Sequence, residues 1–449
     1  LIMNRTILFT PVGGTDPISS TNGHDGSMLH ICRQYKPDEV VLYMSKEMLD
    51  FQEQDNRYLY CLQRLAKLQN RHMDYKIIER RELTKVHEFD YFYNDFRTII
   101  MDIYKNMDET DRLLLNISSG TPAMKSGLLV LQTIGEYPAT LVQVTTPEQA
   151  INEHVHKDYD VKFLWNYDED NREDFQNRCK EISCPSLSKM KQEDIIKHHV
   201  KAYDYQAAID VAEELPEEDT EAYYDMLYIG AKRLMLDFSS IDKVMKNKPK
   251  KVFPVTASAD RKYFEYALNL DVKLKKEEYV DFVRGITPIV LDLFEMVLKK
   301  QCDFDVEQYS NRKGKNKVRR WNMNKMRDTK YLTILNDYAQ ERFHTPFKAG
   351  EVYSGHLMTL ITGLSRDMHV VKLVQDIRDV EENVRNLAAH QIITITEDKI
   401  KELTGFSSKK IMDMLKELFA YTGISIHKEY WNAYDDMNDW ILQAMDKND

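Results

Sequence analysis

The decapeptide NISSGTPAMK, residues 116–125, lies between the apolar run Leu113-Leu114-Leu115 and a helix-forming run that extends to Gln132. Either serine of the decapeptide can cap the helix, its glycine lets a ligand approach the backbone, and its proline suits the first helical turn. Free N–H groups and the positive helix end would then face outward, as in a phosphate-binding turn. An ordinary strand-to-helix turn has the same residue types, so this stretch alone does not separate the two interpretations. It is not a P-loop, because Met124 stands where that motif needs a glycine before its lysine.

An alternation of short strand-like runs with longer helical patterns surrounds this turn. The strand-like runs are Thr6–Thr10, Val40–Met44, Tyr75–Ile78, Arg112–Ile117 and Thr140–Val144. The alternation predicts an α/β domain with a parallel sheet, whose ligand-binding loops follow the strands along one edge. A second polar loop, Pro11 to Pro17, follows the first strand, and the two loops share one pocket if their strands are neighbours. That loop lacks the G-x-G-x-x-G pattern of a dinucleotide site.

Length and composition describe a soluble, multidomain protein. The chain has 449 residues, of which 43% are hydrophobic and 30% charged, which suits two or three domains. No apolar run approaches the roughly 20 residues of a membrane span, and no signal peptide is evident. The five cysteines are scattered without a C-x-x-C pair, so neither a disulfide framework nor a metal site is indicated. We therefore expect a cytoplasmic protein with no metal cofactor and no membrane contact.

The net charge of -11 argues against a protein that coats nucleic acid indiscriminately. One local stretch is basic, however: Asn311 to Lys330 carries nine Lys or Arg residues against one acid, Asp328. Trp321 within it could stack on a base. The stretch is either a local RNA-binding site or a solvated basic loop.

The strand pattern ends in an acidic, turn-rich passage, Asp168 to Asp174, followed by Cys184-Pro185-Ser186. We place a domain boundary there, between an α/β domain of residues 1–178 and a helical region of residues 187–449. Short extended pieces are expected at Ile392–Thr396 and Gly423–Ile426. The expected helices are Lys189–Leu215, Ala222–Leu236, Asp260–Asn269, Lys276–Lys300, Thr329–Glu341, Asp367–His390 and Ser408–Ala420.

The helix Asp367 to His390 carries an apolar stripe with spacings of three and four residues, which suits packing in a bundle or against a second copy of itself. It ends in Arg385-Asn386-Leu387-Ala388-Ala389-His390. Asn386 and His390 share a helix face, whereas Arg385 and His390 lie about 140° apart. A single straight helix therefore does not clasp a phosphate between Arg385 and His390. The stripe consists of Val370, Leu373, Ile377, Val380, Val384 and Leu387.

The chain resembles the CARF-HEPN ribonucleases of type III-A CRISPR systems, the Csm accessory RNase family. The resemblance rests on the Gly13-Gly14 loop, the turn Ser118 to Pro122 and the R-N-x3-H pattern from Arg385 to His390. The resemblance covers nearly the whole chain, although the segment from Lys189 to Asn311 matches no motif. It implies a Rossmann-like CARF domain followed by a helical HEPN domain. Arg80 and Arg81 also stand at R-x4-6-H spacing from His87, but they lie in the α/β region.

This resemblance implies a homodimeric endoribonuclease that cuts single-stranded RNA without metal and is activated by a cyclic oligoadenylate, with six adenylates expected. It assigns catalysis to Arg385, Asn386 and His390. Independently of the resemblance, the charge excess of the basic stretch leads us to expect RNA binding by Arg312, Arg319, Arg320 and Trp321. The residues expected to bind the cyclic oligoadenylate are Thr10, Pro11, Val12, Gly13, Gly14, Thr15, Asn116, Ser118, Ser119, Gly120, Thr121, Pro122 and Lys125.

Two alternatives remain open at this point. The protein could be a ligand-responsive binding protein whose helical half recruits a partner without cutting RNA. It could also degrade the cyclic oligoadenylate in its own CARF pocket, as a ring nuclease. RNA cleavage and the appearance of linear oligoadenylate distinguish these alternatives.

Overall fold

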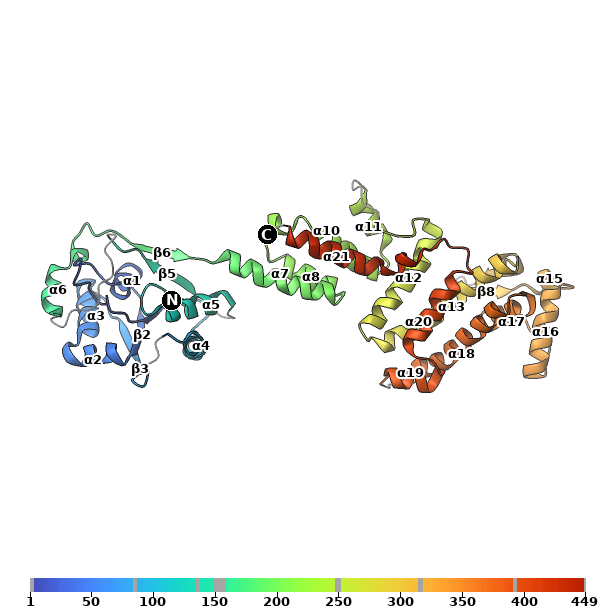
Figure 1. The fold of residues 1–449 in the computed structure, drawn as a ribbon, viewed down its shortest axis with the longest axis horizontal. Helices are drawn as coiled ribbons and strands as arrows, with labels where there is room; N and C mark the ends of the chain where they lie inside the picture. The colour runs from blue at the N-terminus through green and yellow to red at the C-terminus, as the bar shows by residue number, and fades with distance from the viewer. Residues whose placement is uncertain are drawn as a thin grey trace. The chain divides into compact units, whose positions relative to one another are not determined.

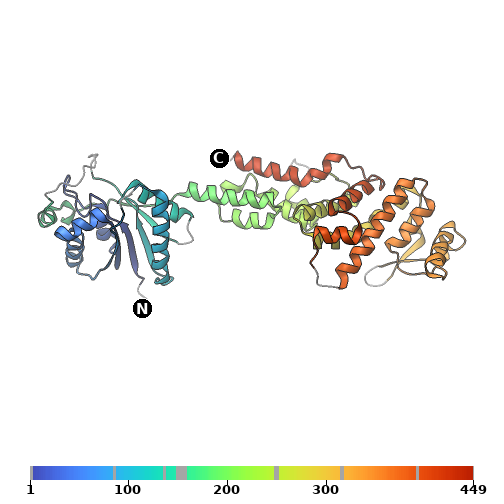
Figure 2. The same cartoon turned by 60° about the horizontal axis from the view of Figure 1, so that its bottom comes forward.

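The structure, a computed structural model, describes residues 4–83, 87–134, 138–147, 159–246, 252–313, 318–390 and 394–447. Within these ranges the side chains of residues 134, 313 and 385–390 are not described. Contacts divide the chain into two units, Leu1–Lys191 and Gln192–Asp449. Each unit is described by itself (Figures 1 and 2).

The N-terminal unit is built on a six-stranded sheet with the order β3-β2-β1-β4-β5-β6. Its first five strands are parallel, and β6 pairs antiparallel with β5. The strands are β1 (Thr6–Pro11), β2 (Glu39–Ser45), β3 (Asp74–Arg80), β4 (Arg112–Asn116), β5 (Thr140–Val144) and β6 (Cys179–Ile182). The predicted α/β class and all five predicted strands are therefore confirmed, whereas β6 was not predicted.

Helices cover both faces of this sheet, because successive side chains of each strand point to opposite faces. On β1, Leu8 joins a core with α1, α2, α3 and α6, while Ile7 and Phe9 join the opposite core with α4 and α5. The helices are α1 (Ser27–Tyr35), α2 (Lys46–Asp55), α3 (Arg57–Leu68), α4 (Phe89–Lys105), α5 (Pro122–Ile134), α6 (Val161–Tyr167) and the 3-10 turn η1 (Glu169–Asn171).

The strand order creates a switch point between β1 and β4. From β1 the chain adds β2 and β3 on one side, and it then returns to place β4 on the other side. The loops after β1 and β4 therefore leave the same sheet edge in opposite directions. Ligands bind at such a crevice in open α/β sheets.

The C-terminal unit is mostly helical, as predicted. A buried stripe of α13, from Phe282 to Leu298, forms its centre, and α12, α17, α18 and α20 pack around it. The helix α7 (Pro185–Lys201) contains the boundary between the two units. The further elements of the C-terminal unit are α8 (Tyr205–Ala212), α9 (Glu217–Thr220), α10 (Tyr224–Leu234), α11 (Phe238–Met245), α12 (Ser258–Lys275), α13 (Tyr279–Gln301), α14 (Val306–Tyr309), β7 (Ser310–Lys313), β8 (Val318–Trp321), α15 (Met323–Met326), α16 (Lys330–Phe343), α17 (Ser354–Leu364), α18 (Met368–His390), α19 (Glu397–Thr404), α20 (Ser408–Phe419), η2 (Lys428–Asn432) and α21 (Ala433–Asp446).

Two local predictions in this unit were wrong. The expected helix Lys189–Leu215 is two helices, α7 and α8, because Tyr203 turns the backbone with a φ of 56° and Asp204 then caps α8. The expected extended piece Gly423–Ile426 forms no strand. Of the other expected piece, Ile392–Thr396, residues 392 and 393 lie outside the described residues.

The apolar stripe of α18 packs inside its own chain. Val370, Leu373, Ile377, Val380 and Val384 are all buried in one core with α13, α17, α19 and α20. Among the described residues, this stripe is therefore not available to a second copy, which corrects one of the two arrangements that the sequence left open. Apolar residues spaced three and four apart predict that one face of a helix is buried, but they do not identify which element covers that face.

Candidate functional site

The ends of β1 and β4 are joined by buried polar side chains. The side-chain amide of Asn116 donates a hydrogen bond to the Thr10 hydroxyl at 2.9 Å. Its carbonyl oxygen accepts the backbone N–H of Ser118 at 2.8 Å, which bends the chain after β4. Since Thr10 and Asn116 are fully buried, they shape the turn and do not offer their side chains to a ligand.

The two loops that follow these strands touch through glycines. A Cβ placed on Gly13 would lie 3.0 Å from the backbone nitrogen of Gly120. Gly120 has a φ of 86°, a left-handed conformation that glycine adopts without strain. A Cβ there would also lie 2.9 Å from that of Pro11. The loops therefore meet as closely as their backbones allow.

Asp16 connects three segments at this edge. Its buried carboxylate accepts the N–H groups of Gly13 at 2.9 Å and Met28 at 3.0 Å, and it also accepts the Ser119 hydroxyl. The Ser119 hydroxyl is in turn hydrogen-bonded to that of Ser27, the first residue of α1. Sequence reasoning assigned no role to Asp16 or Ser27. The sequence offered only weak signals for them: Asp16 is a short polar residue in a loop, and Ser27 is a short polar residue at the start of a helix.

Burial also shifts the pKa values of the two ionisable side chains at this edge, Asp16 and Lys125. It raises the pKa of Asp16 above its usual range, although hydrogen bonds from Ser119, Gly13 and Met28 oppose this shift. Burial lowers the pKa of Lys125, and the charge of Asp16 opposes that change. Burial thus disfavours the charged form of both groups, and Lys125, which is only partly covered, is the one that can attract an anionic ligand.

The predicted ligand residues fall into two groups. One group is buried and builds the loops: Thr10, Pro11, Val12, Asn116 and Ser119. The other group is at least partly accessible: Gly13, Gly14, Thr15, Ser118, Gly120, Thr121, Pro122 and Lys125. Within the accessible group, Ser118 also accepts the backbone N–H of Val144 at 2.7 Å, so its hydroxyl fixes the end of β5.

A cavity of about 340 Å³ opens where β5 ends, beside the turn after β4, and its lining includes Thr145, Phe175 and Arg178. Arg178 donates to the Thr145 carbonyl at 3.1 Å and forms an ion pair with Asp170 at 2.6 Å. The lining thus combines the Phe175 ring and two guanidinium groups, Arg172 and Arg178, with the carboxylates of Glu169, Asp170 and Asp174.

Asp170 of this lining, together with Asp25 and His30, places potential metal-ligand atoms within 4.8 Å of one another. Arg33 pairs with Asp25 at 2.6 Å, and Arg178 pairs with Asp170. Because two guanidinium groups already pair with these carboxylates, the cluster is a buried ionic network.

The residues predicted to be catalytic, Arg385, Asn386 and His390, lie in the last two turns of α18, and their side chains lie outside the described ones. The turn of α18 before these residues contains side chains that form ion pairs. Arg378 pairs with the buried Glu381 at 3.2 Å and with Glu382 at 3.4 Å.

Among the described residues of the basic stretch, β7 and β8 pair as antiparallel strands and α15 follows them. Trp321 is only 4% exposed, and its indole N–H donates to Nδ1 of the buried His356 at 3.1 Å. Its predicted role in base stacking is therefore wrong, because the ring is a core residue. Arg319 is also mostly covered and pairs with Glu295 and Glu307, whereas Arg312 and Arg320 are exposed.

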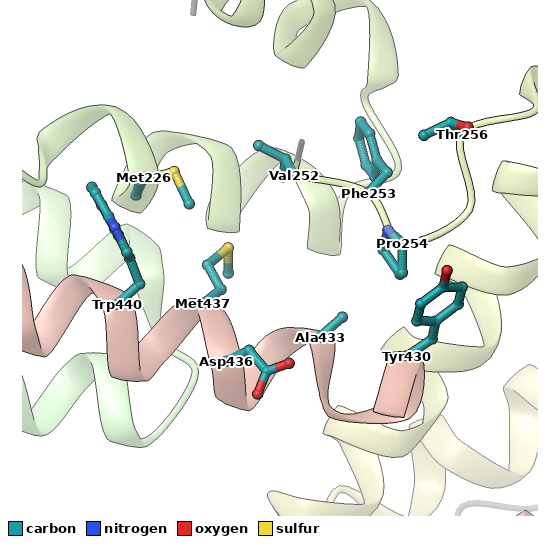
Figure 3. A pocket seen from close by; sticks show the side chains of 10 residues that line it. All are labelled: Met226, Val252, Phe253, Pro254, Thr256, Tyr430, Ala433, Asp436, Met437 and Trp440. Atoms are coloured by element: carbon teal, nitrogen blue, oxygen red, sulfur yellow. The ribbon is translucent and has the colours of Figure 1, made fainter. Parts of the chain in front are cut away.

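A further cavity of about 530 Å³ lies between α10, residues 252–256 and α21 (Figure 3). Its lining includes Met226, Phe253, Met437 and Trp440, and Asp436 is the charged residue among the described lining residues. An apolar lining with an acidic side chain does not suit an anionic nucleic acid.

Comparisons with known proteins identify three regions. Family models match the Cas_Csm6 CARF domain over residues 74–179, the Csm6 6H domain over residues 182–234 and the Cas_Csm6 HEPN domain over residues 252–442. The 6H match falls largely in the segment that carried no recognisable motif in the sequence.

Similar proteins span the chain. "CRISPR system endoribonuclease Csm6" of Mycobacterium tuberculosis is 29% identical over 98% of this chain and 99% of its own length. The protein of the same name from Streptococcus thermophilus is 30% identical over 66% of both chains. A solved structure, Enterococcus italicus Csm6 bound to cyclic hexa-2′-fluoro-hexa-dAMP, has the same fold, with a TM-score of 0.69 and 18% identity over 98% of this chain and 99% of that one. Among the described helices, none is long and apolar enough to cross a membrane.

Proposed function

The chain belongs to the Csm6 family of CRISPR-associated endoribonucleases, and from this membership we infer that it cuts single-stranded RNA in antiviral defence when a cyclic oligoadenylate binds its CARF domain. The observation that carries this proposal is the meeting of the Gly13 and Gly120 loops at the switch point of the sheet. Close backbone approach and the start of α5 suit a phosphate-rich ligand.

The activator is proposed to contact the accessible residues of these loops, with the Thr145 cavity receiving a base. Thr121 and Lys125 offer a hydroxyl and an ammonium group at the start of α5. We propose a ring of six adenylates. This choice is supported by the bound ligand of the Enterococcus italicus protein, a cyclic hexanucleotide analogue.

RNA cleavage is proposed to use the RNA's own 2′-hydroxyl, which attacks the neighbouring phosphorus while the bond to the 5′-oxygen breaks. This reaction needs a base, an acid and a cation for the phosphate charge. His390 would transfer the protons, since imidazole titrates near neutral pH. Arg385 would grip the phosphate oxygens, and Asn386 would orient reacting groups by hydrogen bonding. No metal ion takes part in this scheme.

The active site is proposed to be composite, with a homodimer supplying two copies of α18. One chain provides one His390, and Arg385 and His390 diverge on a single straight helix. Ligand in the CARF half would shift the two helix ends into a productive spacing. Such coupling between sites is typically worth about 1–3 kcal/mol in binding free energy. The protein is proposed to act in the cytoplasm, in keeping with its five free cysteines.

The test measures cleavage of a fluorescent single-stranded RNA by the purified protein with cyclic tetra- or hexaadenylate, with and without EDTA. We expect hexaadenylate to switch cleavage on and EDTA to leave it unchanged. No cleavage despite ligand binding would favour a binding protein without RNase activity. Linear oligoadenylate among the products would add ring-nuclease activity to the CARF pocket.

A further inference from the structure

An exposed group of aromatic rings lies next to α18. It consists of the rings of Tyr338 and Phe343 on α16 and of Tyr353 before α17, together with the guanidinium group of Arg342. We call these four residues the ring surface. Phe343 is 55% exposed and Tyr353 39% exposed, so both present ring faces to solvent.

Arg342 organises this surface. Its guanidinium carbon lies 5.9 Å from the ring centroids of both Tyr338 and Phe343, and it donates to the Tyr338 hydroxyl at 2.8 Å. The ring of Tyr353 is held in place by the buried ring of His356, with 3.7 Å between the centroids. The rings are therefore fixed before any partner arrives, which lowers the entropic cost of binding.

The ring surface is attached to the end of α18. Arg342 pairs with Glu382 of α18 at 3.6 Å. Glu382 precedes Arg385 by three residues, or about 4.5 Å of helix rise. Figure 1 shows α16, α17 and α18 as neighbouring helices of the C-terminal unit, as their contacts also indicate.

The hairpin extends this surface at its other side. The backbone of Glu351 bridges that of Arg320, and the N–H of Val352 donates to the Arg319 carbonyl at 2.9 Å. Tyr353 thus follows directly from a segment paired with β8, the strand that carries the exposed Arg320. Cationic and aromatic side chains therefore follow one another from the hairpin to α18.

We propose that the ring surface holds substrate RNA by base stacking, so that the strand runs from the hairpin arginines over Phe343 and Tyr353 to the cleavage motif. This inference rests on the proposed function. Aromatic faces accept any base, and neighbouring guanidinium groups attract the backbone, which is how single strands are bound without sequence preference. The adjoining cationic hairpin favours RNA over a second copy of this acidic chain as the occupant.

The experiment measures fluorescence anisotropy of a labelled single-stranded RNA of mixed sequence with the full chain carrying His390→Ala and saturated with cyclic hexaadenylate. Adding Phe343→Ala and Tyr353→Ala should weaken RNA binding about tenfold or more. Tyr353→Phe should retain affinity because the ring remains. The matched control is Phe163→Ala with Tyr167→Ala, an exposed ring pair on α6, which should change nothing.

A strand of the same length without bases separates stacking from charge. The Ala variants should bind this abasic strand as well as the parent does, because it has nothing to stack. Equal affinities of parent and variants for normal RNA would overturn the proposal, as would equal losses on both strands. The proposal would also be overturned if the Phe343→Ala, Tyr353→Ala variant sedimented as a monomer and its parent as a dimer. The surface would then be a contact between two copies of the chain. Activator-dependent cleavage by the parent protein is unaffected by these outcomes and tests the proposed function separately.

Discussion

Gly13 stands so close to Gly120 that a Cβ on Gly13 would lie 3.0 Å from the backbone nitrogen of Gly120. This contact joins the loops after β1 and β4 at the switch point of the sheet. Any side chain added here must push the loops apart, and the ligand site proposed between them is expected to change with their separation.

Gly13→Ala should raise the activator concentration needed for half-maximal RNA cleavage by about tenfold while leaving the fully activated rate nearly unchanged. The added methyl group displaces the loop within the N-terminal unit, whereas the residues proposed for cleavage belong to the C-terminal unit. Isothermal titration with cyclic hexaadenylate gives the affinity directly. Gly350→Ala is the matched control, since the nearest neighbour of its Cβ lies 3.9 Å away. Equal affinities of the Gly13 variant and the parent would contradict a ligand site at this contact.

Asp16→Asn should weaken activator binding and lower the stability of the N-terminal unit by about 1–3 kcal/mol. The carboxylate accepts three donors, whereas an amide presents its own N–H group to one of them. Asp160→Asn is the control, because Asp160 also accepts two backbone N–H groups but only caps α6. If both variants lose stability and neither loses affinity, Asp16 has a structural role alone.

Arg319 and Arg320 should behave differently although they are adjacent in the sequence. Arg319→Ala should cost about 1–3 kcal/mol of stability, because it leaves the partly buried Glu295 without its cation. Arg320→Ala should leave stability unchanged and weaken RNA binding, with a smaller salt dependence. Urea unfolding and RNA titration at two salt concentrations measure both effects. A stable Arg319 variant with weakened RNA binding would reverse this assignment.

The C-terminal unit should lose stability in mild acid through His356. Burial lowers the pKa of His356 to about 4, and its Nδ1 accepts a hydrogen bond from Trp321, so the folded state holds the neutral ring. In the unfolded chain this pKa returns to about 6.5. The stabilisation is therefore complete above about pH 6.5 and is lost as the pH falls toward 4.

Between pH 7.5 and 5.5 this loss should amount to about 1 kcal/mol. His356→Gln keeps an acceptor for Trp321 but does not titrate, so its unfolding free energy should vary less over this range. His427→Gln, at an exposed position, is the control and should follow the parent. Parallel pH profiles of the parent and the His356 variant would show that another group carries the acid sensitivity.

His390→Ala should abolish RNA cleavage and leave activator binding and dimerisation in place, and Arg385→Ala should do nearly the same. The proposed chemistry has no other group for these proton transfers. His369→Ala is the matched control, because His369 lies on the exposed start of the same helix. Cleavage rates, isothermal titration and sedimentation measure the three properties. Activator-dependent cleavage by the His390 variant would move the search to other residues of the C-terminal unit.

Much of the N-terminal fold could be predicted, because parallel strands covered on both faces must be apolar throughout, as Leu113-Leu114-Leu115 is. The edge strand β6 escaped prediction for the opposite reason. It is short and partly exposed, and its residues Cys179-Lys180-Glu181-Ile182 include two charges, so only pairing with β5 makes it a strand.

Local physics in the sequence thus determined the sheet, the glycine turn and the helical pattern of α18, since backbone conformation and burial periodicity depend on near neighbours. Tertiary structure alone decided which partner covers a given face. In the basic, tryptophan-containing stretch, β7 pairs with β8 and Trp321 lies in the core. The apolar stripe of α18 packs against α13. Likewise, only the fold brought Asp16, Ser27 and Ser119 together, because contacts between residues far apart in the chain depend on the packing of whole elements.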